Sequence, residues 1–249
     1  MKGNQPTHMV GNPEIHPPRE NSLRNWGIFV AASLAVWALY FWWRPPAPML
    51  FLKHQEHLGH NSKAVSLTID DAPHPLTTPL LLASLKRAGV KATFFCVGEG
   101  LRIYPELAHR IVADGHRLAN HSHPHHNLTT VDANFYPHHI DACFAAIENV
   151  GKEAGIPQQT RLFRPPGGGM NREVMRYLYD RGHTLAWWSN NVGDWTCPPA
   201  WKIADGVKAN LEGGDILLLH DGGTGTPQAI PAIVKEARKR GLHFVVMPE

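Results

Sequence analysis

Four histidines lie within six residues of the segment Asn120–Leu128, which reads NHSHPHHNL. Imidazole is the commonest metal ligand in proteins, so this density favours a metal site over a chance surface cluster. Two pairings are open at this point. His121 and His123 would point to the same side of a strand, whereas His121 and His125 would meet on one turn of a helix.

Two adjacent carboxylates, Asp70 and Asp71, follow the apolar run Val65–Ile69 and precede Ala72-Pro73. Because side chains alternate along a strand, one carboxylate could bind a metal while the other accepts a proton. Considered alone, an Asx turn before a proline is the commoner explanation of such a pair. The pair therefore indicates a functional site only in combination with polar residues elsewhere in the chain.

Three further polar segments come directly after apolar runs. They are Phe163–Gly169 (FRPPGGG), Asn190–Trp195 (NNVGDW) and Leu217–Gly223 (LLLHDGG). The first places an arginine beside a stiff diproline and three glycines, whose backbone N–H groups can approach a ligand. The last contains His220, and a lone histidine at a strand end is more often structural than catalytic. Five polar sites after five predicted strands together indicate an active site.

The segments that must position these residues alternate between strand and helix. Seven short apolar or β-branched runs predict strands: Val65–Ile69, Thr93–Val97, Arg117–Asn120, Leu162–Arg164, Thr184–Trp188, Ile216–Leu219 and His243–Met247. Six segments between them predict helices: Thr77–Ala88, Pro105–Ala113, Ala133–Glu153, Arg172–Arg181, Pro199–Leu211 and Pro227–Arg240. This alternation indicates parallel strands in a barrel or a doubly wound sheet, both of which bind ligands at the carboxyl ends of strands.

The composition of the 249-residue chain permits a packed core, with 43% hydrophobic and 18% charged residues. The formal net charge is +3 and no dense run of Lys and Arg occurs, so we expect no nucleic-acid partner. The three cysteines form no CxxC pair, which excludes a disulfide scaffold and a zinc ribbon.

The 18 residues Trp26–Trp43 carry no charge, and Arg24 and Arg44 bracket them. A helix of this length spans roughly 27 Å, close to a hydrocarbon core of about 30 Å, and aromatic residues at both ends suit the membrane interfaces. We therefore expect an uncleaved membrane anchor. A cleaved signal peptide and a buried helix are the alternatives, although no clear small-x-small cleavage site follows the run.

The proposed anchor divides the chain into four parts. Residues 1–25 are polar and expected to be disordered, residues 26–43 are the transmembrane helix, residues 44–61 are a proline-containing linker, and residues 62–249 are the functional domain. Positive charges on the two sides of the anchor are nearly balanced. We expect a single-pass membrane protein with its domain on the extracytoplasmic side, or a secreted protein if the segment is cleaved.

The five polar segments, in this order, resemble those of the polysaccharide deacetylases, carbohydrate esterases that include chitin and peptidoglycan deacetylases. The resemblance runs from about Ser62 to Glu249. Thr68–Pro73 is similar to the family motif Thr-Phe-Asp-Asp-Gly-Pro, and His121 and His125 occupy both positions of His-(Ser/Thr)-x-x-x-His. The other matching residues are Arg164, Pro166 and Gly168 (Arg-x-Pro-x-Gly), Asp194 and Trp195 (Asp-Trp), and Leu218 and His220 (Leu-x-His).

The resemblance implies a distorted (β/α)7 barrel, similar to a TIM barrel, after the N-terminal transmembrane helix. It also implies that Asp71, His121 and His125 hold a divalent metal, with zinc expected. Two imidazoles and one carboxylate leave coordination positions for water and substrate. By the same resemblance, Asp70 is the general base and His220 the general acid.

Further roles follow from the same resemblance. Arg164 is expected to pair with Asp70, and Asp194 to orient His220. The residues implied to contact substrate are Pro166, Gly167, Trp195 and Leu218, with Trp195 and Leu218 lining the acetyl pocket and the Gly167 backbone N–H near the oxyanion.

Three departures from the family motifs bear on the site. Ala72 stands where the family has Gly, and its methyl group would be strained if φ were positive there. Ile69 stands where the family has Phe, and Gly167 stands where it has an aromatic, which predicts a more open substrate floor. His123 and His126 have no assigned role and are expected to be solvated or to lie behind the metal ligands.

The activity implied by the resemblance is removal of N-acetyl groups from amino sugars of a cell-envelope polysaccharide, either peptidoglycan or a chitin-like polymer. The alternatives are a deacylase of another acetylated glycan or sugar-lipid, a non-catalytic carbohydrate-binding relative, and an unrelated metal hydrolase that pairs His121 with His123. Both proton-transfer residues are present, which counts against a non-catalytic relative. A metallo-β-lactamase-like protein would have Asp in place of His125, and an amidohydrolase would need a later metal-bridging Lys at a strand end, which we do not find.

Overall fold

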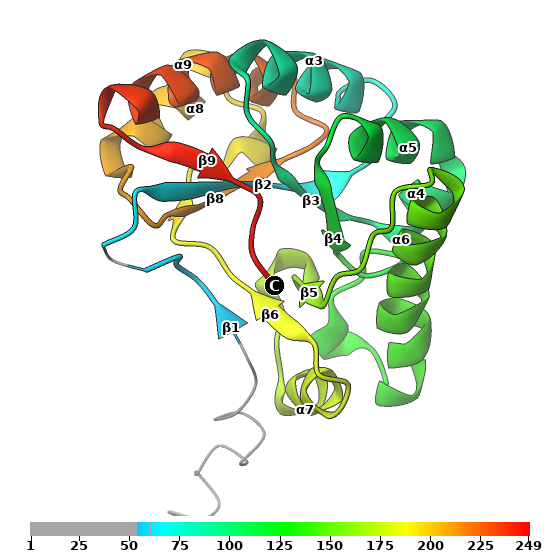
Figure 1. Ribbon diagram of the computed structural model, residues 1–249. Helices are drawn as coiled ribbons and strands as arrows, with labels where there is room; N and C mark the ends of the chain where they lie inside the picture. The colour runs from blue at the N-terminus through cyan, green and yellow to red at the C-terminus, as the bar shows by residue number, and fades with distance from the viewer. Residues whose placement is uncertain (1–53, 60) are drawn as a thin grey trace, which may run out of the picture. The chain divides into compact units, whose positions relative to one another are not determined.

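Figure 1 shows a computed structural model that describes residues 54–59 and 61–249. The predicted N-terminal segment 1–25, the anchor 26–43 and residues 44–53 of the linker lie outside the described residues. Within the described part, no helix is both long and apolar enough to cross a membrane.

The described residues form one sheet of nine strands, in which every neighbouring pair is parallel. The strands are β1 (His54–Gln55), β2 (Ala64–Ala72), β3 (Thr93–Cys96), β4 (Arg117–Asn120), β5 (Leu162–Phe163), β6 (Thr184–Ala186), β7 (Asn190–Asn191), β8 (Ile216–His220) and β9 (His243–Val245). Their order is β1-β6-β5-β4-β3-β2-β8-β7, and β9 pairs with the start of β2. The predicted α/β class with parallel strands is confirmed.

The sheet is a distorted part-barrel. Strands β2 to β6 are neighbours in chain order, as in a β/α barrel, but the path ends at β1 and β7, so the described strands form no closed ladder. The segment 184–191 contains both β6 and β7, and it pairs with β5 at its start and with β8 at its end. Only three residues separate β6 from β7. Through them the chain passes from β6, next to the edge strand β1, to the opposite edge strand β7.

The helices are α3 (Thr78–Ala88), α4 (Gly98–Ile103), α5 (Pro105–Ala113), α6 (Ala142–Glu153), α7 (Arg172–Asp180), α8 (Ala200–Asn210) and α9 (Gly225–Lys239). The expected helix Ala133–Glu153 is wrong in its first half, because a π-helical turn at Pro137–Asp141 precedes α6. Proline cannot continue a regular helix, which explains the irregular start. The short helix α4 was not predicted, since two of its six residues are glycines.

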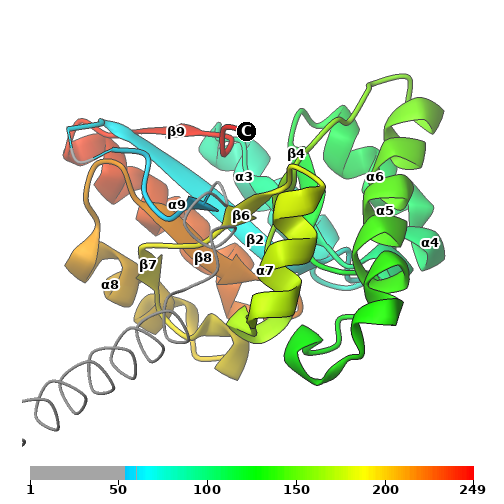
Figure 2. The ribbon, with the colours of Figure 1, turned by 90° about the horizontal axis from the view of Figure 1, so that it is seen from below.

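The helices cover the outer face of the sheet in two groups. Helices α3, α8 and α9 lie beside β2 and β8, while α4, α5 and α6 lie beside β4 (Figures 1 and 2). Outward residues of the strands, such as Ile69 and Leu219, join the apolar cluster with these helices. Alternate residues, such as Phe95 and Ile216, form a separate cluster inside the barrel. Both faces of the central strands are therefore buried, and their carboxyl ends form a rigid rim.

Candidate active site

The predicted site residues meet where β2, β4, β5 and β8 end, around a cavity of about 330 Å³. The cavity is lined by Asp70, Asp71, His121, His125, Pro165, Gly167, Gly168, Trp188, Asn191, Trp195, Leu218 and His220. Eight of the eleven residues proposed from the sequence are in this set. Of the other three, Arg164 and Asp194 are buried behind the wall, and Pro166 is buried while its neighbour Pro165 faces the cavity.

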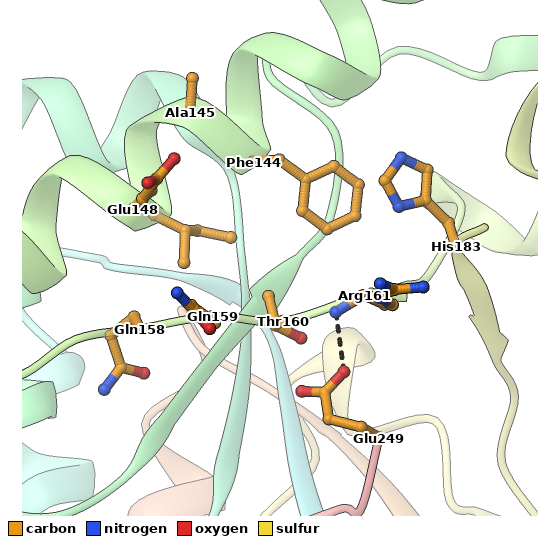
Figure 3. A pocket seen from close by; sticks show the side chains of 10 residues that line it. Phe144, Ala145, Glu148, Gln158, Gln159, Thr160, Arg161, His183 and Glu249 are labelled. Carbon is orange, nitrogen blue, oxygen red and sulfur yellow. Dashed lines mark hydrogen bonds between the residues drawn. The ribbon is translucent and has the colours of Figure 1, made fainter. Parts of the chain in front are cut away.

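A larger cavity of about 630 Å³ lies elsewhere, between α6 and the starts of β5 and β6 (Figure 3). It is lined in part by Phe144, Arg161, His183 and Glu249, with the Phe144 and His183 rings stacked 4.1 Å apart. Burial lowers the pKa of His183 to about 4. No residue proposed from the sequence lines this cavity, so size alone does not identify the site.

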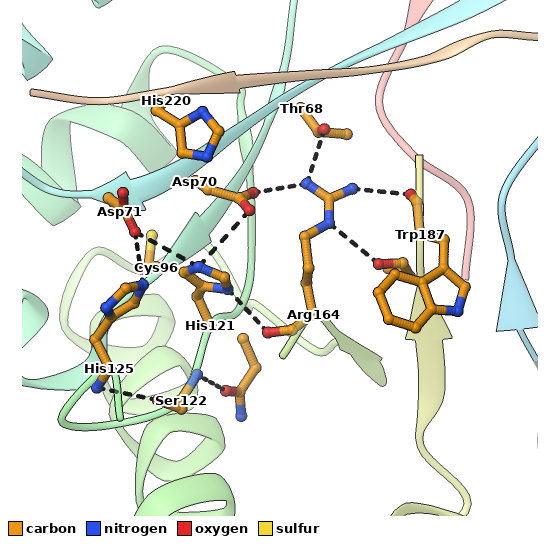
Figure 4. Close-up of polar contacts among 12 residues, drawn as sticks. Thr68, Asp70, Asp71, Cys96, His121, Ser122, His125, Arg164, Trp187 and His220 are labelled. Carbon is orange, nitrogen blue, oxygen red and sulfur yellow. Dashed lines mark hydrogen bonds and ion pairs between the residues drawn. The ribbon is translucent and has the colours of Figure 1, made fainter. Parts of the chain in front are cut away.

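Asp71 lies between two imidazoles. Its Oδ1 atom is 3.0 Å from His125 Nε2 and 3.5 Å from His121 Nε2 (Figure 4). Burial acts to raise the pKa of Asp71, but the hydrogen bonds and charges of the two histidines outweigh it and lower that pKa strongly. Among the described residues, this is the one group of three His, Cys, Asp or Glu side chains whose ligand atoms lie within 4.8 Å of one another.

The orientation of His121 is fixed from behind. Its Nδ1 atom lies 2.8 Å from the carbonyl oxygen of Arg164, so Nδ1 carries the proton and donates it there. The Nε2 lone pair is then free on the side of Asp71. A backbone partner of this kind is the usual device that orients a metal-binding histidine. The two imidazoles and one carboxylate therefore fit a divalent metal.

The backbone at Asp71 explains why both adjacent carboxylates line the same cavity. Strict alternation would send Asp70 and Asp71 to opposite faces of β2. Asp71 instead has φ of 68°, and the pairing of β2 with β3 shifts register between Asp70 and Ala72. This irregularity at the strand end turns the second carboxylate towards the histidines.

The concern about Ala72 is not supported. The positive φ falls on Asp71, whereas Ala72 is not among the residues with a left-handed backbone. Ala72 and Ile69 are both fully buried in the cluster beneath the helices. The two replacements relative to the family motif therefore affect packing behind the site and do not contact the cavity.

The loop after β4 selects His125 over His123 as the partner of His121. Ser122 and His125 both have left-handed backbones, with φ of 65° and 58°. The Ser122 hydroxyl accepts a hydrogen bond from the His125 N–H at 3.1 Å, which closes the turn. As a result the His121 and His125 rings lie 4.9 Å apart, and His123 does not line the cavity. The structure thus favours the pairing of His121 with His125.

Asp70 is held by a buried arginine. Arg164 donates from Nη1 to Asp70 Oδ1 at 2.6 Å, and both side chains are buried. The guanidinium also bonds to the Thr68 hydroxyl and to the carbonyl oxygens of Ala186 and Trp187, so this buried cation has several partners. Asp70 Oδ2 is not part of this ion pair and lies 3.7 Å from His121 Nε2.

His220 is paired with a buried carboxylate. Its Nδ1 lies 2.8 Å from Asp194 Oδ1, while Asp194 Oδ2 accepts from the His220 backbone N–H and from the Thr226 hydroxyl. Burial acts to lower the pKa of His220, but the hydrogen bond to Asp194 and the charges of Asp70, Asp194 and Asp71 raise it above its usual value. Because Nδ1 faces Asp194, Nε2 is the nitrogen available for proton transfer.

Two of the predicted contact residues form an apolar side of the cavity. The Trp195 ring is 54% exposed and meets the His220 ring edge-on at 5.2 Å, while Leu218 is buried. Gly167 has φ of 60°, and nothing lies within 4 Å of where its Cβ would be. There is therefore open space beside Gly167.

Asp221, directly after His220, was not proposed from the sequence. Its carboxylate accepts hydrogen bonds from the Thr77 hydroxyl at 2.5 Å, from the Thr78 hydroxyl, and from the backbone N–H groups of His74 and Gly222. Burial raises its pKa despite these donors. The side chain thereby ties the loop after β2 to the loop after β8. Trp188 and Asn191 were also missed as lining residues, although Trp188 ends the fifth predicted strand and Asn191 lies within the polar segment after it.

The family model for polysaccharide deacetylase matches residues 58–186, which is 129 of the 249 residues. The chain belongs to the polysaccharide deacetylase family. It is therefore a hydrolase of the amide-cleaving kind, and the family's dependence on a metal agrees with the Asp71–His121–His125 group.

Individual relatives support the assignment to this family of deacetylases. The chain is 32% identical over 213 residues to a peptidoglycan-N-acetylglucosamine deacetylase of Bacillus cereus, covering 81% of this chain and 97% of the relative. It is similar to a crystal structure of a peptidoglycan N-acetylglucosamine deacetylase, with a TM-score of 0.75, 29% identity and coverage of 83% and 96%. A pseudoenzyme of carbohydrate esterase family 4 from Bacillus anthracis also matches, with a TM-score of 0.71, 26% identity and coverage of 78% and 67%.

Proposed function

We propose that this deacetylase removes the acetyl group from N-acetylglucosamine units of peptidoglycan. One observation carries the proposal: a three-residue metal-ligand group, a buried Asp–Arg pair and a buried His–Asp pair all border one cavity. Because one of the similar structures is a pseudoenzyme, the fold alone does not establish catalytic activity. Here both residue pairs needed for proton transfer are present. The relative from Bacillus cereus, 97% of whose length is covered, supports peptidoglycan as the polymer.

Asp71, His121 and His125 would hold the metal, and we propose zinc. Two imidazole nitrogens and one carboxylate oxygen are donors that zinc accepts, and three protein ligands leave room for further ligands. When bound, the metal would lower the pKa of a water and polarise the acetamide carbonyl. The ligand atoms of these three residues lie within 4.8 Å of one another, which supports the proposed assignment.

Asp70 is proposed to accept the proton of the attacking water. Arg164 holds Oδ1, which leaves Oδ2 to accept the proton. The buried guanidinium also provides the positive charge that stabilises the Asp70 carboxylate at a place that solvent does not reach. The position of Asp70 beside His121 places the base next to the metal ligands. Its orientation is fixed before substrate arrives, as effective general base catalysis requires.

His220 is proposed to protonate the leaving amine. As the carbonyl carbon–nitrogen bond breaks, the amine nitrogen takes the proton from Nε2, and acetate leaves with the oxygen of the water. Asp194 holds Nδ1 and stabilises the charged imidazolium, so the proton is available at the cavity side. Trp195 and Leu218 are proposed to hold the acetyl methyl group, and the Gly167 N–H to face the developing oxyanion.

The test is acetate release by the full chain, purified in detergent micelles with zinc. Peptidoglycan, chitin oligomers, poly-N-acetylglucosamine and acetylated xylan serve as substrates. We expect release from peptidoglycan, and none from the Asp70→Asn variant, which should still bind metal. Release from xylan alone would favour the alternative deacylase, and no release from any N-acetylglucosamine polymer would overturn the proposal.

We further propose that residues 26–43 anchor the protein in a membrane, with residues 62–249 as the catalytic domain on the extracytoplasmic side. The uncharged run and its aromatic ends support the anchor, and a cell-envelope substrate supports the orientation. Fractionation of cells should place the intact chain in the membrane, and protease added outside the membrane should cut the domain. A mature chain that begins after residue 43 would show instead that the segment is a cleaved signal.

A further inference from the structure

Six histidines lie between residues 121 and 139, and the proposed metal centre uses two of them. The four others are His123, His126, His138 and His139, here called the four-histidine cluster. Their rings form a continuous row. Ring centroids are 5.6 Å apart for His123 and His138, 5.7 Å for His138 and His139, and 5.4 Å for His126 and His139.

The backbone holds the two halves of the cluster together. His123 donates its N–H to the carbonyl oxygen of His139 at 2.6 Å, which joins the loop after β4 to the π-helical turn before α6. Asn120 reinforces the link by donating from its side chain to the Ile140 carbonyl at 2.9 Å. The loop that carries His125 and the turn that carries His138 and His139 are therefore fixed side by side.

The separations of neighbouring rings in the row are close to that of two imidazoles that share a metal ion. Two imidazoles on one tetrahedral zinc have centroids about 5 Å apart, since each Zn–N bond is about 2.0–2.1 Å. The proposed catalytic pair of His121 and His125 provides an internal reference at 4.9 Å. The centroid separations of the three pairs in the cluster exceed this reference by less than the length of one Zn–N bond. Small rotations of the exposed rings would close the difference. His126 and His138 are the exposed members, so their rings are free to turn.

The two inner members lack other partners. His139 is 6% exposed, and the Nδ1 atoms of His123 and His139 form no hydrogen bond with any described residue. Nδ1 of His123 faces Gly98, where an added Cβ would lie 2.3 Å from it, which leaves Nε2 as the donor of that ring.

We propose that the four-histidine cluster is a second metal site, distinct from the catalytic one, that takes a transition-metal dication through imidazole nitrogens. The donor set is all imidazole, which suits Zn²⁺, Ni²⁺ or Cu²⁺ and disfavours Mg²⁺ and Ca²⁺. Among the described residues only the catalytic group has its donor atoms already gathered, so the second site binds more weakly. An ion there would clamp the loop that carries His125 onto the start of α6.

The site is tested by counting bound ions on the full chain. Purified protein is dialysed against Zn²⁺ and its metal content is measured by mass spectrometry. We expect two ions per wild-type chain and one for the variant His126→Gln/His138→Gln, whose changed residues are exposed. The variant His121→Ala/His125→Ala should also keep one ion. His243→Gln, an exposed histidine on β9, is the matched control and should keep two.

A spectroscopic measurement identifies the ligands. Cu²⁺ is added to the His121→Ala/His125→Ala variant, and the hyperfine structure of its electron paramagnetic resonance spectrum reports the nitrogen donors. We expect several imidazole nitrogens, and loss of this signal with at least about tenfold weaker binding when His126 and His138 are also replaced by Gln. One ion per wild-type chain, or an unchanged copper spectrum after these replacements, would overturn the proposal.

Discussion

Two groups of histidines meet at the loop after β4, the second with two members on the π-helical turn before α6, and they differ in the partners that lie behind each ring. His121 has the Arg164 carbonyl behind it and Asp71 in front, and His125 also faces Asp71. In the four-histidine cluster no carboxylate joins the row, and two buried Nδ1 atoms have no partner among the described residues. The second group has more histidines but is the less preorganised of the two. Preorganisation therefore comes from the partners that orient each imidazole and not from the number of imidazoles.

The largest effect is expected from removing the ligands of the preorganised group. His121→Ala/His125→Ala should lower kcat/KM by at least about 10³-fold, because a metal supplies several kcal/mol of transition-state stabilisation and each 1.36 kcal/mol is tenfold. Acetate release and metal content are measured together. If the variant kept most of its activity, the catalytic group would lie elsewhere and the comparison would fail.

A smaller loss separates metal binding from proton transfer. Asp70→Asn should lower kcat by about 10²–10³-fold with little change in bound metal, because the amide cannot accept the proton of water. Arg164 would also lose its buried anionic partner, so the thermal unfolding temperature is measured alongside. A variant that lost metal as well as activity would show that Asp70 is part of the ligand set.

The pH dependence tests His220. The pKa of its imidazole is raised in the folded protein, so the acid form persists to higher pH, and activity is expected to fall as pH rises through that pKa. Asp194→Asn removes the largest raising contribution, the hydrogen bond from Nδ1. The alkaline limb of kcat should then move to lower pH, with kcat reduced about 10–10²-fold at neutral pH. An alkaline limb that does not move would remove His220 from the role of acid.

Asp221 is expected to act through position. Asp221→Asn should destabilise the protein by about 1–3 kcal/mol, because donors from two loops lose a charged acceptor in a buried place. We expect kcat to fall by less than tenfold, with an unchanged pH profile. Asp205→Asn, on the exposed side of α8, is the matched control and should leave the unfolding temperature unchanged. A shifted pH profile for Asp221→Asn would assign this carboxylate a share in proton transfer.

Much of this arrangement could be predicted from local patterns. Seven of the nine described strands, the parallel sheet and the set of polar residues at strand ends each follow from runs of a few residues, such as Ile216–His220. The two-residue strands β1 and β7 were not predicted. A turn such as the one at Asp71, with its left-handed backbone, could not be predicted, because only a small share of aspartates adopt that conformation and no local pattern marks this one.

Contacts between distant segments also escaped prediction. The hydrogen bond from Thr77 to Asp221 joins residues 144 positions apart, and no local pattern marks it. The row formed by His123 with His138 depends on a π-helical turn that begins at Pro137, where a regular helix was expected. The histidine density was visible in the sequence, but its division into two groups required the fold.

The smallest effect on catalysis is expected from the second group. His126→Gln/His138→Gln should leave kcat/KM within about twofold of wild type at saturating zinc, because neither ring lines the catalytic cavity. The same variant should differ from wild type when zinc is added in excess, since wild type alone gains thermal stability from a second ion that links the His125 loop to α6. Unfolding temperatures across a zinc titration report this difference. Two curves that rise together would show that the added stability comes entirely from the Asp71–His121–His125 group, so that only the preorganised histidines bind.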